Sequence, residues 1–240
     1  MRKDYRPYAA KKGWLKFQKL YTRHFIAPQL QSLGKGYVFM NPWHVRLFGG
    51  PIEIGDYSHF IAASDGKIRI SVWPASGETQ GRIRIGSYTL VCPGVRISAA
   101  RQIVIEDNCM LAYGVYITDN DWHGLYNRLA MGRPAPVHLG NNVWVGDSAI
   151  ICKGVTIGEN SIIGAGAVVV TDIAANTVAA GNPARVVKAL DPDEPLTTRE
   201  RWFADPARLS REFMAWEKAV LKGNTFLGWL RHVLFPAKGD

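Results

Sequence analysis

The sequence has 240 residues and contains no run of 18 or more apolar residues, so it predicts no membrane-spanning helix. Cysteine is scarce. Cys92, Cys109 and Cys152 are widely spaced and odd in number, which argues against a disulfide framework and against a CxxC zinc site. The composition, 47% apolar and 20% charged, is not that of a disordered chain. The first residues lead into no apolar signal-peptide stretch, so we expect no secretion and a reducing, cytoplasmic location.

Basic residues outnumber acidic residues at both ends of the chain. The first 30 residues hold eight basic side chains and one acidic, residues 197–240 hold eight basic and five acidic, and the middle is close to neutral. A nucleic-acid-binding domain would more often carry its positive charge across the folded body, so we expect no nucleic-acid partner. Basic ends suit peripheral contact with an anionic membrane face, although the alternative that they only aid solubility stays open.

The middle of the chain repeats every six residues. From residue 139 onward, every sixth residue is Leu, Ile or Val, and the residue after it is mostly glycine. The six positions are Leu139, Val145, Ile151, Ile157, Ile163 and Val169. The same period is present upstream, with a shift of two residues between its two halves. Those positions are Ile85, Val91 and Ile97, then Ile105, Leu111 and Ile117.

A period of six fits neither an α-helix, with apolar residues three and four apart, nor a long strand, with apolar residues two apart. It fits a short strand followed by a bend, with one aliphatic side chain pointing inward on each flat side and glycine permitting the bend. Three such sides form a triangular coil of about 18 residues, and each coil buries its apolar face on its neighbours. Residues 71–82 and 119–136 interrupt the pattern, so we expect them to be loop excursions.

Four segments within and after the repeats resemble a known family. They are Asn142–Gly146, Lys153–Ser161, Ile163–Val169 and the closing segment Gly181–Lys188, which begins Gly-Asn-Pro-Ala-Arg. Together they resemble the left-handed parallel β-helix acyltransferases built from hexapeptide repeats. Within that family they are most similar to the galactoside and maltose O-acetyltransferases and the bacterial polysaccharide O-acetyltransferases. The resemblance covers residues 50–190 and neither end of the chain.

The resemblance implies an all-β core, a left-handed parallel β-helix, with α-helical extensions at both ends. The expected boundaries are 1–35 for a basic helical extension, 36–190 for the β-helix domain and 191–240 for a C-terminal helical extension. Local signals suit helices in the extensions: residues 8–31 are amphipathic, 197–200 offer a capping box, and Asp205-Pro206 suits a helix start. Residues 225–235 are strongly apolar, as expected of a segment that lies on a membrane or packs on protein.

The same resemblance implies a CoA-dependent O-acetyltransferase that moves an acetyl group from acetyl-CoA to a sugar hydroxyl. The expected process is biosynthesis of a surface polysaccharide such as O-antigen, capsule or exopolysaccharide. The expected assembly is a homotrimer with active sites between subunits and no metal. Two alternatives stay open: an N-acyltransferase acting on an amino sugar, amino acid or antibiotic, and a noncatalytic β-helix binding module. A metalloenzyme of the γ-carbonic anhydrase type would need three convergent histidines, and only His123 and His138 are near one another in the sequence.

Acyl transfer to a hydroxyl needs a general base, and His123 is the candidate. It lies near the start of the longer excursion, where the family carries its catalytic histidine, although the local sequence is Asp-Trp-His-Gly rather than the family's Gly-His-Pro or Asp-His type. A carboxylate or a backbone carbonyl would hold the second ring nitrogen, with Asp121 or Asp119 as the candidate carboxylate. Asp119 and Asn120 are also candidates for acceptor binding, and both aspartates could instead cap the loop. We expect no acyl-enzyme, because the three cysteines fall on repeat positions and are expected to pack.

The resemblance also places the pantetheine arm of acetyl-CoA along the coils between two subunits. The matching positions here are Trp144, Gly146, Ala165 and Gly166. Small residues there let a thin ligand approach the backbone. Arg185 and Lys188 match the basic pair near the adenosine phosphates. Trp144 could instead be a packing residue, and the basic pair could be a solvated surface.

Overall fold

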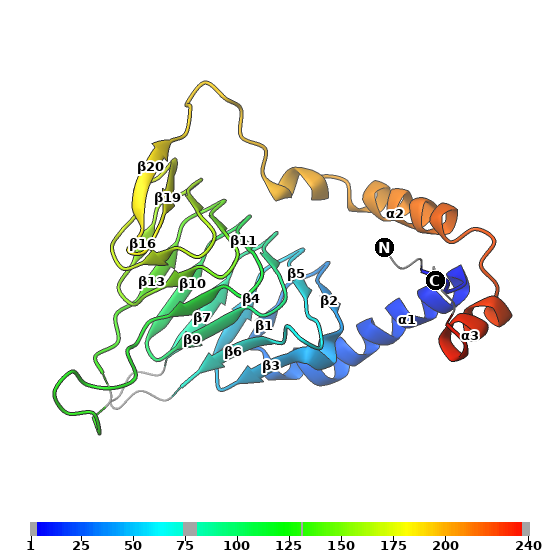
Figure 1. Cartoon of the computed structure of the whole chain (residues 1–240), viewed down its shortest axis with the longest axis horizontal. Helices are drawn as coiled ribbons and strands as arrows, with labels where there is room; N and C mark the ends of the chain where they lie inside the picture. The colour runs from blue at the N-terminus through cyan, green and yellow to red at the C-terminus, as the bar shows by residue number, and fades with distance from the viewer. Residues whose placement is uncertain (1–3, 74–80, 131, 237–240) are drawn as a thin grey trace.

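A computed structural model of the chain describes residues 4–73, 81–130 and 132–236. Its centre is a triangular prism of three β-sheets (Figure 1), and the chain visits the sheets in rotation. We name them sheets A, B and C in the order in which the chain first enters them. The arrangement is typical of a left-handed parallel β-helix and confirms the predicted fold class.

The strands contain two to five residues each. Sheet A consists of β1 (Ser32–Leu33), β4 (Ile52–Ile54), β7 (Arg82–Ile85), β10 (Gln102–Ile105), β13 (Val137–Leu139) and β16 (Thr156–Ile157). Sheet B consists of β2 (Val38–Met40), β5 (His59–Ile61), β8 (Leu90–Val91), β11 (Met110–Leu111), β14 (Trp144–Val145), β17 (Ile162–Ile163), β19 (Thr177–Ala180) and β20 (Arg185–Ala189). Sheet C consists of β3 (Val45–Phe48), β6 (Ile68–Val72), β9 (Arg96–Ala99), β12 (Tyr116–Thr118), β15 (Ile150–Ile151) and β18 (Val168–Val169). Successive strands of each sheet pair in parallel until β20, which runs antiparallel to β19.

The inward side chains of the strands form a continuous aliphatic core. The six hexad residues from Leu139 to Val169 are all 0% exposed, as the period of six predicts. These residues pair in register with inward residues of neighbouring coils. Ile151, for example, pairs with Ile117 of the coil before it, and Ile117 pairs in turn with Ile97. Full burial of one such side chain contributes about 1.5–3 kcal/mol. The stack of these residues is therefore the principal source of stability in the prism.

In the later coils, asparagines in the left-handed backbone region make the corner between sheets A and B. Asn142, Asn160 and Asn176 have φ values of 58°, 59° and 58°. Asparagine adopts this region more readily than most residues that carry a Cβ. The side-chain amides form a ladder, in which Asn142 Nδ2 donates to Asn160 Oδ1 (3.0 Å) and Asn160 Nδ2 donates to Asn176 Oδ1 (2.8 Å). The ladder keeps successive coils aligned at this corner.

Both expected excursions leave the prism at the corner between sheets C and A. The first is shorter than expected, since β6 continues to Val72 and β7 begins at Arg82, and residues 74–80 lie outside the described part. The second occupies residues 119–136, between β12 and β13, and projects from the edge of the prism in Figure 1. Each loop is an insertion at a bend, so neither disturbs the stacked core.

The N-terminal extension begins with α1 (Tyr8–Tyr21). The single helix predicted over residues 8–31 does not form. After α1 the chain continues as a π-helical turn, η1 (Thr22–Ile26), and a 3-10 turn, η2 (Ala27–Gln29). Gln18 of α1 is buried against the first coil, where its side chain accepts a hydrogen bond from the N–H of Asn41. The helix is therefore attached to the base of the prism by a polar contact as well as by apolar packing.

The C-terminal extension returns along the outer face of sheet B. Its first helical turn, η4 (Arg199–Phe203), packs there with Phe203 buried beside His59 and Tyr88. Arg199 Nε donates to the carbonyl oxygen of Tyr88 (2.7 Å). Burial of the imidazole, together with the nearby Arg199 cation, lowers the pKa of His59 to about 4. The capping box expected at residues 197–200 does not form, because the N–H of Glu200 donates to Asn108 Oδ1 (2.7 Å) and not to the side chain of Thr197.

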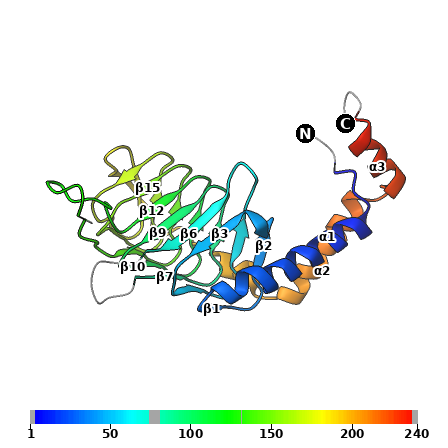
Figure 2. The ribbon, with the colours of Figure 1, turned by 90° about the horizontal axis from the view of Figure 1, so that it is seen from below.

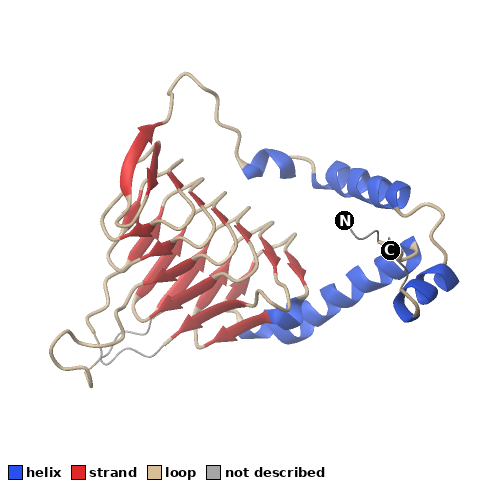
Figure 3. Ribbon diagram, in the orientation of Figure 1, coloured by secondary structure: helices blue, strands red, loops and turns tan. Residues whose placement is uncertain are grey.

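Two helices complete the chain, α2 (Pro206–Val220) and α3 (Phe226–Leu234). Asp205 caps α2 by accepting a hydrogen bond from the N–H of Arg208 (2.9 Å), as Asp205-Pro206 predicts. Asn224 Nδ2 donates to the carbonyl oxygen of Asp4 (2.7 Å), which ties the two extensions together. Figures 1, 2 and 3 show all three helices at the end of the prism where the β-helix begins. Within residues 4–73, 81–130 and 132–236, no helix is long and apolar enough to cross a bilayer.

Candidate functional site

The loop that carries His123 is anchored by a buried carboxylate. Asp119 is 0% exposed. Its Oδ1 accepts a hydrogen bond from the N–H of Ala100, and its Oδ2 accepts from the N–H groups of Arg101 and Gln102, each at 2.7 Å. Both carboxylate oxygens are therefore engaged by backbone of the preceding coil. Of the roles considered for Asp119, the geometry favours capping the loop over contact with an acceptor or with His123.

The imidazole of His123 is exposed and oriented by a backbone carbonyl. Its Nδ1 lies 2.9 Å from the carbonyl oxygen of Arg128. A carbonyl can only accept, so Nδ1 carries the hydrogen and Nε2 presents a lone pair. Asp121 does not hold this ring, because its carboxylate forms an ion pair with Lys153. The arrangement leaves Nε2 available as a proton acceptor at the surface of the loop.

Asn120 is buried beneath the same loop. Its side-chain Nδ2 and Oδ1 have no hydrogen-bond partner within the part of the chain that the structure describes. A Cβ placed on Gly132 would lie 3.1 Å from Asn120 Oδ1 and 3.0 Å from the carbonyl oxygen of His123, so the loop closes tightly over this amide. A buried unpaired amide is costly. The side-chain amide of Asn120 is therefore a buried polar group close to His123 whose donor and acceptor atoms are both unpaired among the described residues.

The residue before His123 has an unusual backbone conformation that sequence reasoning did not anticipate. Trp122 has a φ of 67°, a region that bulky residues adopt only under structural constraint. Its ring lies 6.0 Å from that of Trp73, measured between centroids, in an edge-to-face arrangement. Trp73 directly follows β6. The signal available in the sequence was a tryptophan beside each of the two excursions.

The residues expected to contact CoA lie together at the corner between sheets B and C. Gly146 follows β14, and Ala165 and Gly166 follow β17 one coil later. The N–H of Gly166 donates to the carbonyl oxygen of Asp147 (2.7 Å). A Cβ on Gly146 would lie 2.7 Å from the N atom of Ala165, whereas a Cβ on Gly166 would meet nothing within 4 Å. Glycine at position 146 permits two coils to approach closely, and glycine at position 166 leaves that point of the corner without a side chain.

The other expected CoA contacts are exposed as well. Trp144 points outward from β14 and is 46% exposed. Arg185 and Lys188 lie on β20, where both side chains are exposed. Arg185 is partly restrained, since its Nη1 donates to the carbonyl oxygen of Ala184 (2.8 Å). None of these side chains is committed to the core, so each is free to meet a ligand or a second chain.

Within one chain, His123 and the residues expected to contact CoA at positions 146, 165 and 166 lie on different edges of the prism. His123 projects from the corner between sheets C and A, whereas the bare glycine corner lies between sheets B and C. One face of the prism, sheet C, separates them. A site that uses both edges is therefore incomplete in a single chain.

The remaining candidate side chains are committed elsewhere. His138 Nε2 lies 3.2 Å from Glu106 Oε1, on the outer face of sheet A. Burial raises the pKa of the Cys109 thiol to about 12 and also raises those of Cys92 and Cys152. Among the described residues no three His, Cys, Asp or Glu side chains come together as a metal site would require.

The repeats match a known family. The sequence pattern described as bacterial transferase hexapeptide (six repeats) matches residues 136–171. The hexapeptide repeat is thus recognised over residues 136–171. It is 41% identical to the galactoside O-acetyltransferase of Escherichia coli K12 over 91 residues, which are 37% of this chain and 45% of that protein. The chain thus spans about half the length of the curated relatives it matches. The resemblance to the hexapeptide-repeat acetyltransferases is confirmed.

Two solved structures are similar to this chain. A mutant N-acyltransferase from Bacillus cereus, in complex with dTDP and coenzyme A, has a TM-score of 0.56 and 19% identity, covering 82% of this chain and 95% of that one. A hexapeptide-repeat acetyltransferase from Vibrio cholerae, complexed with acetyl-CoA, has a TM-score of 0.49 and 22% identity, covering 76% of this chain and 88% of that one. The first likeness supports the β-helix fold.

The anchoring role of Asp119 can be tested by Asp119→Asn. The neutral amide can accept at one atom only, so at least one of the three backbone N–H groups loses its partner, and a hydrogen bond to a charged group contributes about 1.5–3 kcal/mol. We expect a lower Tm and faster hydrogen exchange at the amides of residues 100–102. Asp121→Asn, on an exposed carboxylate of the same loop, is the control and should leave those amides protected. Unchanged exchange in Asp119→Asn would contradict the anchor.

Proposed function

We propose that the protein is an acetyl-CoA-dependent O-acetyltransferase that acts on a sugar hydroxyl during surface polysaccharide assembly in the cytoplasm. The observation that carries the proposal is the geometry of His123, an exposed imidazole whose Nδ1–H is held by the carbonyl oxygen of Arg128. Free Nε2 lone pairs of this kind serve as general bases. The similarity to a galactoside O-acetyltransferase supports a sugar as the acceptor.

In the proposed mechanism His123 Nε2 takes the proton from the acceptor hydroxyl as its oxygen attacks the thioester carbonyl carbon. The tetrahedral intermediate collapses by breaking the carbon–sulfur bond, and the imidazolium returns the proton to the departing thiolate. The Arg128 carbonyl stabilises the imidazolium, because Nδ1–H remains its donor throughout. The buried amide of Asn120 would contact an acceptor hydroxyl only after the loop over it opens, and the ion pair of Asp121 with Lys153 restrains that loop.

Direct transfer is proposed because no thiol is suited to carry the acetyl group. A thiolate is the reactive form of cysteine, and burial raises the pKa of all three thiols. The pantetheine arm is proposed to lie along the corner formed by Gly146, Ala165 and Gly166, with Trp144 beside it. Arg185 and Lys188 would meet the phosphates, which are dianionic or anionic groups suited to exposed cations.

His123→Ala should lower kcat for acetyl transfer by about 10²–10⁴-fold, the usual contribution of a general base. The side chain is exposed, so the Tm should change little. The measurement is release of CoA thiol with a panel of monosaccharides, including galactosides, and with glucosamine to detect N-acetylation. His138→Ala, which removes a half-exposed histidine on sheet A, is the matched control and should keep its activity. Near-normal turnover in His123→Ala would eliminate this residue as the base.

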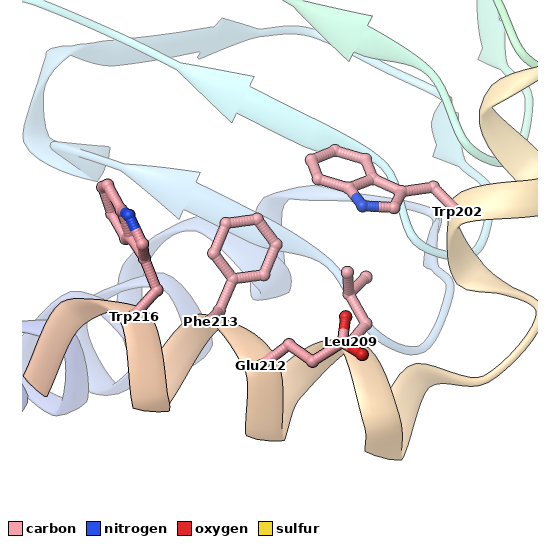
Figure 4. A pocket seen from close by; sticks show the side chains of 5 residues that line it. All are labelled: Trp202, Leu209, Glu212, Phe213 and Trp216. Carbon is pink, nitrogen blue, oxygen red and sulfur yellow. The ribbon is translucent and has the colours of Figure 1, made fainter. Parts of the chain in front are cut away.

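The proposed assembly is a homotrimer, in which the His123 edge of one chain meets the glycine corner of its neighbour. The apolar stripe on α2 contacts Trp202 and is otherwise little covered by the residues that the structure describes. Figure 4 shows Leu209, Phe213 and Trp216 on one side of α2, together with Trp202, and no residue of α2 is buried. An isolated helix of this length is marginally stable in water. A neighbouring copy that covers this stripe would stabilise it.

Hybrid trimers test the shared site. We expect His123→Ala and Ala165→Trp each to be inactive, the first without its base and the second with its exposed corner blocked. Co-expression of the two variants should restore part of the wild-type activity, because some interfaces then combine an intact His123 with an intact corner. Light scattering should give the mass of three chains. A mixture as inactive as its components would mean that each site lies within one chain.

Peripheral membrane contact is the last part of the proposal. The side chains of Leu20 and Phe25 in the N-terminal extension and of Leu227 in α3 are exposed, and Lys16 and Lys19 are exposed on the first of these segments. Apolar and basic side chains at one end of the molecule suit an anionic bilayer. The chain should float with phosphatidylglycerol vesicles at low salt and less at high salt, and Leu227→Glu should reduce the bound fraction. Equal flotation with phosphatidylcholine, or none at low salt, would contradict this contact.

A further inference from the structure

A row of three aromatic rings runs along the corner between sheets C and A and ends at the His123 loop. Phe48 ends β3, Trp73 follows β6, and Trp122 directly precedes His123. The ring centroids of Phe48 and Trp73 are 4.6 Å apart, and those of Trp73 and Trp122 are 6.0 Å apart. Phe48 is 53% exposed and Trp73 is 42% exposed. Large exposed aromatic side chains in a contiguous row mark a binding surface rather than a core.

Hydroxyl groups fix the orientation of the central ring. The indole Nε1 of Trp73 donates to Ser71 Oγ (3.2 Å), and Ser71 Oγ lies 3.0 Å from Ser98 Oγ on the next strand. The polar edge of the indole is thus already satisfied by its own protein. The ring face is the part of an aromatic side chain that packs against the C–H groups of a sugar ring, and it takes no part in these hydrogen bonds.

A column of arginines lies beside this row on the outer face of sheet C. Arg46, Arg69 and Arg96 occupy successive strands in direct register, and all three are exposed. Like charges directly opposite one another destabilise a sheet. No ion pair joins any of the three to a carboxylate within the described residues, and Arg96 instead lies 4.2 Å over the ring of Tyr116. The column therefore has an unbalanced positive charge that an anionic ligand would neutralise.

The row and the column belong to the same surface. Side chains two apart on a strand point to the same side, so Arg46 and Phe48 are neighbours on β3, as Arg69 and Ser71 are on β6. Farther along sheet C, the outward residues Tyr116, Ile150 and Val168 are half-buried and mostly apolar. That later part suits packing between subunits. The first three coils offer arginine, hydroxyl and aromatic ring faces instead, which do not suit a dry interface.

We propose that this surface, which we call the acceptor track, binds an acidic oligosaccharide and leads it to His123. The track consists of Phe48, Trp73, Trp122, Arg46, Arg69 and Arg96. Ring faces stack on successive sugars, and guanidinium groups pair with the carboxylates or phosphates that the sugars carry. The inference rests on the proposed function and deepens it: the acceptor is an extended, negatively charged glycan. It approaches from the first coils, whereas CoA is bound by later ones.

The test is calorimetric titration of the 240-residue chain with a hexamer of galacturonate and with maltohexaose, a neutral hexamer. We expect the acidic hexamer to bind at least about tenfold more tightly. Trp73→Ala should weaken its binding about 3- to 10-fold, the range for one aromatic contact, and Phe48→Ala gives an independent second variant. Arg69→Gln should weaken binding and reduce its dependence on salt. Trp14→Ala on α1 and Arg211→Gln on α2, which change an exposed tryptophan and an exposed arginine outside the track, are matched controls that should bind as the wild type does.

Equal binding of maltohexaose, or binding that survives both Trp73→Ala and Arg69→Gln, overturns the proposal. Inorganic polyphosphate, an anion without sugar rings, separates the two parts of the surface. If its binding equals that of the galacturonate hexamer and Trp73→Ala changes neither, the surface is a plain anion patch and the track is wrong. In the enzymatic arm, Trp73→Ala should raise the KM for the hexamer more than the KM for galacturonic acid itself.

The track and the proposed function can fail separately. Hexamer binding that Trp73→Ala weakens, with no acetyl transfer to any acceptor, would leave the track standing and remove the acetyltransferase. Transfer to monosaccharides without any binding of the acidic hexamer would remove the track alone.

Discussion

The stacking of one aliphatic side chain above another inside the prism constrains every other feature of this protein. Each coil has to return its inward residues to the same column, so the bends fall at the same three corners in every coil. Insertions are tolerated only at those corners, where no inward residue is displaced. Both long loops leave at a corner, the one between sheets C and A, and the longer of them carries His123.

The carboxylate of Asp119 connects that scaffold to the reactive part of the loop. It lies at the point where β12 ends, and its two oxygens bind three backbone N–H groups of the coil before it. A loop of this length would otherwise be free to move as a whole. With its first residue fixed, the left-handed turn at Trp122 and the hydrogen bond from His123 to Arg128 define where the imidazole projects. The catalytic proposal therefore depends on a residue that touches neither ligand.

The arrangement also gives the two ends of the prism different properties. The terminal helices, with their basic and apolar side chains, gather where the β-helix begins, and the proposed CoA corner lies in later coils. An acceptor held near a membrane would thus reach His123 from one end while the acetyl donor reaches it from the other. The two ligands would meet at the level of β12 without crossing one another.

The sequence by itself determined the repeat, the strand positions and the burial of each hexad residue, because a period of six has one structural solution that buries an aliphatic residue on every side. It also singled out His123, since few side chains in the loop can accept a proton near neutral pH. It could not assign Asp119, whose role depends on backbone N–H groups of residues 100–102 that come near only when the coils stack. It did not reveal the row from Phe48 through Trp73 to Trp122 or the column from Arg46 to Arg96. These neighbours are 23 to 49 positions apart in the sequence and meet only because the coils stack. The tertiary structure alone sets the register of that stacking.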